Sequence, residues 1–140
     1  MTQEEKELLL KDICARLPYN AKVEITNPST GIKIKKLDAI ALGVVKGFAN
    51  GYITDTVIKP YLFPLSSMTE EQKNECFKGT PLEIDKYGGI AVKDDLYGGS
   101  LYTDLEIYLE VIDWLHKNHF DYRGLIEKGL AIDATGLNIY

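Results

Sequence analysis

The segment from Thr103 to Lys117 constrains the fold more than any other part of the sequence. Thr103 and Glu106 have the Ser/Thr-x-x-Glu spacing of a capping box, so we expect a helix to begin there. At 100° per residue, apolar side chains occupy more than half of its circumference, in two stripes. The stripe expected to face the core is Leu105, Tyr108, Leu109, Ile112 and Leu115, and the stripe expected to face outward is Ile107, Val111 and Trp114. Such a helix either lies between two layers or offers one stripe to a partner.

The first 17 residues also predict a helix. Thr2 and Glu5 repeat the capping-box spacing, and Pro18 ends the helix at about Leu17. Because two cysteines provide neither a disulfide framework nor a four-ligand zinc site, we expect Cys14 and Cys76 to be buried free thiols. The apolar face expected to lie on another element is Leu9, Leu10, Ile13, Cys14 and Leu17.

Residues 21–58 predict an antiparallel β-meander. Val23 and Ile25 alternate with polar residues, and turn-forming residues at 27–31 precede a second alternating segment. The apolar run 39–45 is typical of a buried strand, and Asn50-Gly51 is a strong hairpin signal.

Residues 59–68 read as an extended crossover, because Pro60 and Pro64 remove backbone donors. A short acidic helix, capped by Ser67 or Thr69, should follow and end near 78–79. We expect one more short helix at 121–128, a left-handed Gly129, and a tail after Asp133 that frays.

These elements predict a single α+β domain over residues 1–140, because 140 residues is the size of one ordinary domain. The expected architecture is an N-terminal helix, an antiparallel β-meander and C-terminal helices packed on one face of the sheet. Residues 69–140 form its helical and loop part.

The charge of the chain argues against nucleic acid as the main partner, because the net charge is −5. Residues 69–140 hold 14 acidic and seven basic residues, which predicts a solvated surface or a face for a basic partner. The longest apolar run is far too short to cross a bilayer, and the acidic first residues do not resemble a secretory signal. We therefore expect a cytoplasmic protein with no membrane contact.

Two histidines near the end of the long helix suggest a metal site. His116 and His119 are three residues apart, and Asp121 could approach them if the chain turns sharply after Phe120. Asp113 is less suitable, because it lies about 120° from His119 on the helical wheel. The favoured interpretation is that both imidazoles complete the packed face, and a metal-dependent hydrolase is the alternative.

The pentapeptide Asp-x-Tyr-Gly-Gly occurs twice, at residues 85–89 and 95–99. Paired glycines permit close backbone approach, and tyrosine adds a flat recognition surface. The favoured interpretation is two turns that bracket a short strand at 89–93, and the alternative is a binding loop for a nucleotide-like ligand. The candidate binding residues are Tyr87, Gly88, Gly89, Tyr97, Gly98 and Gly99.

Residues 58–71, which begin Ile-Lys-Pro-Tyr-Leu-Phe-Pro, and residues 113–131, which begin Asp-Trp-Leu-His-Lys-Asn-His, resemble a group of small proteins. These uncharacterised proteins are encoded by gut anaerobes of the Bacteroides type and by their phages or prophages. The resemblance covers about a quarter of the chain. It implies a bacterial or phage setting and a small accessory protein, and it assigns no activity or catalytic residue.

Together these features favour a non-enzymatic interaction or host-modulating accessory protein of a phage or mobile element. We expect it to bind a protein partner, or a second copy of itself, through the Tyr-Gly-Gly loops and the stripe Ile107, Val111 and Trp114. No catalytic or cofactor-binding motif is present, so we expect no cofactor. The metal-dependent hydrolase and the small-ligand binding protein are the alternatives.

Overall fold

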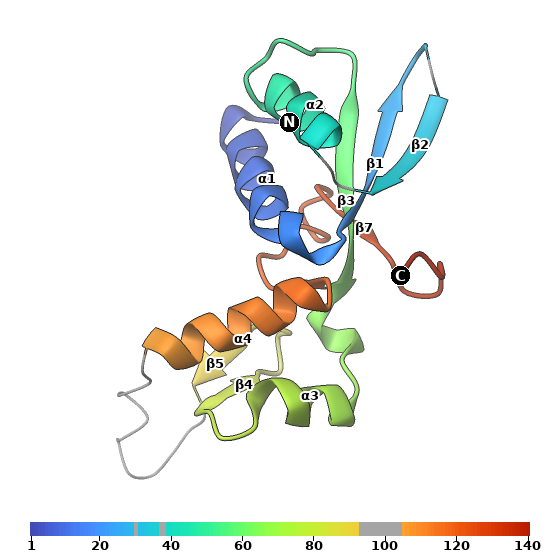
Figure 1. Ribbon diagram of the computed structural model, residues 1–140. Helices are drawn as coiled ribbons and strands as arrows, with labels where there is room; N and C mark the ends of the chain where they lie inside the picture. Colours follow the sequence, from blue (N-terminus) through green and yellow to red (C-terminus); the bar gives the residue numbers. More distant parts are fainter. Residues whose placement is uncertain (30, 37–38, 93–104) are drawn as a thin grey trace.

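The computed structural model describes residues 1–29, 31–36, 39–92 and 105–140, and it confirms the α+β class with an N-terminal helix (Figure 1). The four α-helices of the described residues are α1 Gln3–Arg16, α2 Ala39–Ala49, α3 Glu70–Phe77 and α4 Leu105–Lys117. The strands are β1 Lys22–Asn27, β2 Gly31–Lys36, β3 Val57–Pro64, β4 Leu82–Ile84, β5 Ile90–Val92, β6 Phe120–Asp121 and β7 Ile132–Asp133.

The main sheet is built around β3. Its order is β2-β1-β3-β6, with β7 also paired to β3. β1 and β2 form the predicted hairpin, and β3 runs antiparallel to β1. β6 and β7 run parallel to β3, so segments from the end of the chain complete the sheet.

The predicted strand at 39–45 is wrong, because α2 occupies residues 39–49. A short apolar run does not distinguish a buried strand from a buried helix. Val45, Phe48 and Ala49 are buried, which is helical spacing, and the run has to be followed beyond residue 45 to see it. The predicted hairpin at Asn50-Gly51 is also wrong. Gly51 ends α2 with a φ of 80°, and its N–H donates to the Phe48 carbonyl.

The predicted crossover at 59–68 is replaced in large part by β3, the central strand. Successive residues of a strand direct their N–H and C=O groups to opposite edges, so residues two apart face the same edge. The Leu62 carbonyl accepts from the Ala134 N–H, so Pro60, two residues earlier, faces the same edge. β7 covers only Tyr61 and Leu62 along that edge. Pro60 therefore lies just before the pairing begins, where the missing donor is tolerated.

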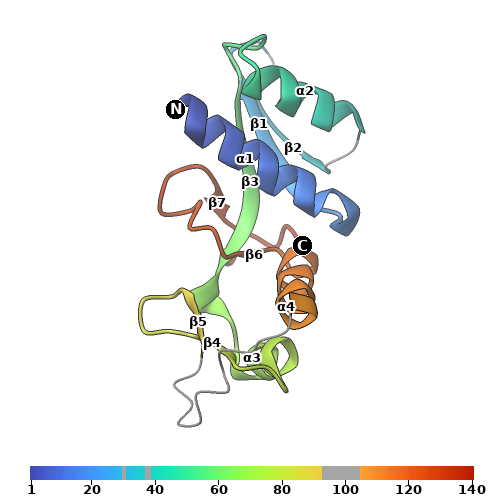
Figure 2. The ribbon, with the colours of Figure 1, turned by 90° about the vertical axis from the view of Figure 1, so that its left-hand side faces the viewer.

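The interior is divided into three clusters. α1 and α2 cover one face of the sheet (Figure 2), and the first cluster lies between them and β1 and β3. The second joins α3, α4 and the β4–β5 hairpin to Leu65 and Phe120, and the third holds Leu62, Leu125, Leu130 and Ala131. Among the described residues, no helix has both the length and the apolarity needed to cross a bilayer.

The observed helix ends agree with the predicted ones better than the observed buried faces do. Thr2 accepts from the Glu5 N–H, and Thr69 and Gln72 form the predicted capping box of α3. On α1, Leu9 and Ile13 are buried as expected. Cys14 is exposed, so the prediction that both thiols are buried is wrong for this one.

The end of the chain also differs from expectation. Asp121 ends β6, and residues 122–128 form bends and turns instead of a helix, although Gly129 is left-handed as predicted, with a φ of 73°. The tail does not fray, because β7 pairs with β3 and the Tyr140 hydroxyl is bound at both β1 and β3.

Two glycine substitutions test whether residues 39–51 form a helix and its cap. Gly43 lies inside α2 with open space where a Cβ would be, so Gly43→Ala should stabilise the protein by about 0.5–1 kcal/mol. Gly51 has a positive φ, so Gly51→Ala should destabilise it by about 1–2 kcal/mol. Urea denaturation measures both, and effects of the same sign would contradict the assignment.

Candidate functional site

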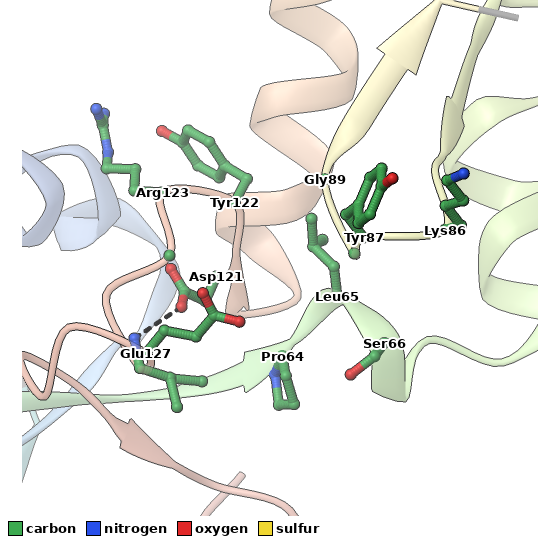
Figure 3. Close-up of a pocket in the computed structure, with 13 residues that line it drawn as sticks. Pro64, Leu65, Ser66, Lys86, Tyr87, Gly89, Asp121, Tyr122, Arg123 and Glu127 are labelled. Carbon is green, nitrogen blue, oxygen red and sulfur yellow. Dashed lines mark hydrogen bonds between the residues drawn. The ribbon is translucent and has the colours of Figure 1, made fainter.

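The first Tyr-Gly-Gly copy lines an open groove of about 500 Å³. Figure 3 shows Tyr87 and Gly89 on one side of this groove and Asp121, Arg123 and Glu127 on the other. The end of β3 and the following turn, residues 64–66, complete it. The structure thus brings Tyr87, Gly88 and Gly89 together with the segment that contains Asp121.

The carboxylate of Asp85 organises this copy as a turn. Its Oδ1 accepts hydrogen bonds of 2.9 Å from the N–H groups of Tyr87 and Gly89. Gly88 has a φ of 79°, and the Asp85 N–H donates to the Gly89 carbonyl at 2.8 Å. The predicted turn is confirmed for residues 85–89. The second copy, with Tyr97, Gly98 and Gly99, lies outside the described residues.

Two charged groups on the opposite side of this groove, those of Asp121 and Arg123, are engaged within the protein. Both oxygens of Asp121 accept backbone hydrogen bonds, at 3.0 Å from the Leu125 N–H and 2.9 Å from the Ile126 N–H. The Arg123 guanidinium bonds Asp12 and lies over the Tyr122 ring. These contacts explain the turns that follow Asp121, and on the facing side of the groove Tyr87 is 82% exposed.

The two apolar stripes of α4 have exchanged roles in its first two turns, whereas Leu115 is fully buried as predicted. Val111 is 2% exposed, Ile107 is half-buried, and Trp114 stacks on Phe120 with ring centroids 5.8 Å apart. The outward stripe predicted from these three residues is therefore wrong. Leu105 and Leu109 are 70% and 58% exposed instead. A helical wheel gives the angle between stripes but not the direction of the neighbouring elements, and α3 and β6 lie on the Val111 side.

The two histidines have separate partners. His116 Nε2 lies 2.7 Å from the Tyr122 hydroxyl, and His119 stacks on Tyr140 with centroids 3.6 Å apart. Both side chains are buried, as the packing interpretation predicted. Within residues 1–29, 31–36, 39–92 and 105–140, no three His, Cys, Asp or Glu residues are placed to hold a metal ion.

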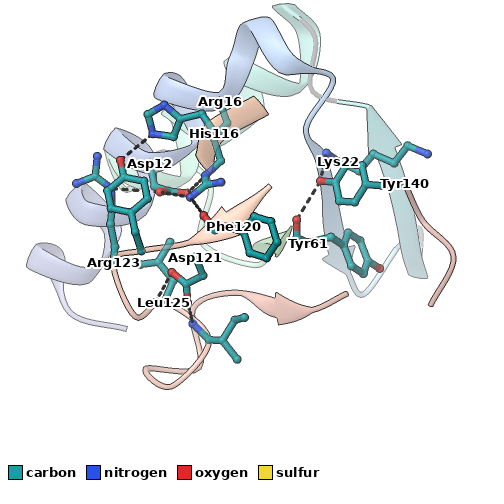
Figure 4. Close-up of polar contacts among 12 residues, drawn as sticks. Asp12, Arg16, Lys22, Tyr61, His116, Phe120, Asp121, Arg123, Leu125 and Tyr140 are labelled. Carbon is teal, nitrogen blue, oxygen red and sulfur yellow. Dashed lines mark hydrogen bonds and ion pairs between the residues drawn. The ribbon is translucent and has the colours of Figure 1, made fainter. Parts of the chain in front are cut away.

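The sequence did not reveal a buried ion pair within α1, which also contacts the segment after α4 (Figure 4). Arg16 Nε lies 2.8 Å from Asp12 Oδ2, and both side chains are 0% exposed. Arg16 also donates to the Phe120 carbonyl at 2.7 Å, and Arg123 lies 3.1 Å from Asp12 Oδ1. Asp12 and Arg16 have i, i+4 spacing and lie on the same helix face as the buried Leu9 and Ile13, and this was the signal that could have revealed the pair.

Burial and nearby positive charges shift the pKa values of several titratable groups. Burial, with the charges of Arg16 and Lys22, lowers the pKa of His119 to about 4. Burial and Arg16 also lower the pKa of His116, so both rings are neutral at pH 7. Burial raises the pKa of the Cys76 thiol to about 12, which makes it unreactive.

Comparisons with known proteins identify no relative: no family model, no curated protein and no solved structure matches the chain. The resemblance of residues 58–71 and 113–131 to small phage and bacterial proteins therefore stays a prediction. The candidate surfaces have to be judged on their geometry.

The first test of this region is the buried ion pair. Asp12→Ala leaves the Arg16 guanidinium buried without its counter-charge, so it should lower the free energy of unfolding by about 3–5 kcal/mol. Replacing both partners, Asp12→Leu with Arg16→Met, should recover part of the loss. Glu70→Ala, which removes an exposed pair with Lys73, is the matched control and should cost about 0.5 kcal/mol or less. Equal losses in urea denaturation would contradict the assignment.

The second test is the pH dependence of stability. The pKa of His119 is about 4 in the folded protein and 6.5 ordinarily, so the unfolded chain binds the proton first as the pH falls. The stabilisation is complete above about pH 6.5 and lost on acidification toward pH 4. His119→Asn tolerates the left-handed backbone and removes the ring. Over that window the native protein should lose about 1–2 kcal/mol more stability than this variant, and parallel curves would contradict the effect.

Proposed function

We propose that this protein binds a basic amphipathic helix of another protein through the outer face of α4. We define the α4 outer face as the exposed Leu105, Tyr108 and Leu109 together with Ile112, which is half-buried. Its exposed apolar stripe is the observation that carries the proposal. Anchors at i, i+3, i+4 and i+7 are the pattern by which one helix receives another.

The apolar part of this face is concentrated on about two turns of one helix. Leu105, Leu109 and Tyr108 are 70%, 58% and 37% exposed. A shallow hollow of about 440 Å³ continues along the helix, bordered by Leu109, Ile112 and His116. Exposed apolar side chains grouped in this way mark interaction sites more often than scattered ones do.

The charges beside the stripe favour a basic partner. Glu106, Glu110 and Asp113 lie along one side of it, at about 80–140° from Leu105 on the helix. Glu110 and Asp113 also border the hollow. Two copies of this face would place acidic rims in contact, which costs free energy. Charge complementarity therefore selects a helix with basic residues beside its own apolar stripe.

The biological setting is part of the proposal. The resemblance of residues 58–71 and 113–131 supports an accessory protein of a phage or mobile element, which would act by binding a host or phage protein in the cytoplasm. A function without catalysis is consistent with the engagement of Asp121 and His116 in contacts within the protein.

A designed peptide tests this function. We expect a labelled helical peptide with a Leu stripe flanked by Lys to bind in fluorescence anisotropy, and the same stripe flanked by Glu to bind at least about tenfold more weakly. Leu109→Lys should weaken binding of the Lys peptide by about tenfold or more, because it adds a like charge at the centre of the face. Leu137→Lys is the matched control, since Leu137 is 50% exposed and lies in the tail, and it should leave binding unchanged.

Several results would overturn the proposal. Equal affinity for the Lys and Glu peptides would indicate non-specific hydrophobic binding. Equal effects of the two lysine variants would show that the peptide binds elsewhere. A concentration-dependent dimer in analytical ultracentrifugation that Leu109→Lys abolishes would show that a second copy occupies the face.

A further inference from the structure

A second groove, of about 510 Å³, lies where the end of α4, the start of α3 and the C-terminal tail meet. It is separate from the α4 outer face and shares no residue with it. Four of its lining residues carry rings, and we call them its aromatic side: Phe63, His119, Phe120 and Tyr140. Its polar lining residues, which we call its polar side, include Ser67, Gln72, Lys117, Asn118 and Thr135.

His119 is the unusual residue of this groove. It ends α4 in the left-handed conformation, with a φ of 64°, and its N–H donates to the His116 carbonyl. The side chain is only 9% exposed, yet within the described part of the chain its Nδ1 has no hydrogen-bond partner. An unsatisfied buried polar atom costs free energy, so a residue that lines this groove has hydrogen-bonding capacity that the described part of the protein leaves unused.

The aromatic side contains one stacked pair of rings, His119 and Tyr140, with Phe63 tilted against Tyr140. Tyr140 accepts from the Lys22 N–H at 2.8 Å and donates to the Tyr61 carbonyl at 2.9 Å. Its ring lies 3.6 Å from that of His119 at an interplanar angle of 11°, and Phe63 packs against it at 5.9 Å. Because the hydroxyl is anchored at two strands, the ring stays in place without a ligand, and such a surface favours planar rings.

The polar side favours an anion. None of the eleven lining residues, all of them described, is an aspartate or glutamate, in a chain whose net charge is −5. Lys117 contributes an ammonium group. The Gln72 carbonyl oxygen is used by the Thr69 N–H in the capping box, which leaves the Gln72 amide donor for other partners. The groove thus combines one cation with neutral donors.

We infer that this groove binds a small organic anion that carries a planar ring. The carboxylate or phosphate lies at Lys117 and the neighbouring amide and hydroxyl groups, and the ring lies against the aromatic side next to His119. An aromatic carboxylate and a nucleoside monophosphate share this chemistry, and the experiment distinguishes them.

Isothermal titration calorimetry with defined compounds is the test. The ring-bearing anions are adenosine and uridine monophosphate, 4-hydroxybenzoate and indole-3-acetate, and the controls are uridine, which lacks the anion, and inorganic phosphate, which lacks the ring. We expect at least one ring-bearing anion to bind with a Kd below about 1 mM, and at least about tenfold more tightly than either control. The compound that binds most tightly shows whether the ligand is an aromatic carboxylate or a nucleoside monophosphate.

Two variants locate the site. Lys117→Gln should weaken binding of the preferred compound by about fivefold or more, and Lys128→Gln, the same charge change at an exposed lysine outside the groove, should not. His119→Asn should remove the preference for ring-bearing anions over inorganic phosphate while the far-ultraviolet circular dichroism stays native. If that variant does not fold, the Lys117 and Lys128 pair decides.

Binding of none of the four anions at about 5 mM would overturn the inference, as would inorganic phosphate binding as tightly as the best of them. Equal losses in Lys117→Gln and Lys128→Gln would also overturn it, because only general charge attraction would then be at work. None of these outcomes bears on the α4 outer face, which is tested with peptides and with Leu109→Lys.

Discussion

The buried pair of Asp12 and Arg16 connects the parts of this protein that the hydrophobic clusters leave separate. The first cluster lies between α1, α2 and the sheet, and the second lies between α3, α4 and the β4–β5 hairpin. Arg16 reaches from α1 to the Phe120 carbonyl of β6, and Arg123 returns to Asp12. Because both members of the pair are fully buried, neither can lose its partner without leaving an uncompensated charge. The end of α4 is thereby held at a defined position relative to α1.

That position determines what the neighbouring residues do. His116 and His119 lie close to Arg16, which together with burial keeps them neutral and makes them hydrogen-bonding and stacking groups instead of cations. With its C-terminal end fixed in this way, α4 has two distinct surfaces. Its outer face presents apolar residues beside an acidic rim, and its C-terminal end contributes Lys117 and His119 to a groove that no aspartate or glutamate lines. One helix thus supplies a surface suited to a basic helix and a different one suited to a small anion.

Local chemistry predicted part of this arrangement. The Asp85 turn followed from its Tyr-Gly-Gly motif, and the capping box at Thr69 followed from the Thr-x-x-Gln spacing, because each is made by groups within four residues. The proposed groove could not be found in this way. Phe63, Lys117 and Tyr140 come from distant parts of the chain, and the tail that carries Tyr140 has no periodic pattern.

What the sequence determined by itself was the α+β class, the ends of α1 and α3, the β1–β2 hairpin and the amphipathic character of α4, all of which depend on short-range spacing. Only the tertiary structure decided that residues 39–49 are helical, that β3 is central despite Pro60, and that Val111 rather than Leu109 faces the interior. In each case the outcome depends on which elements lie nearby. An apolar stripe is buried on whichever side another element lies, and a proline is tolerated wherever its edge is unpaired. Both conditions are set by residues far away in the chain.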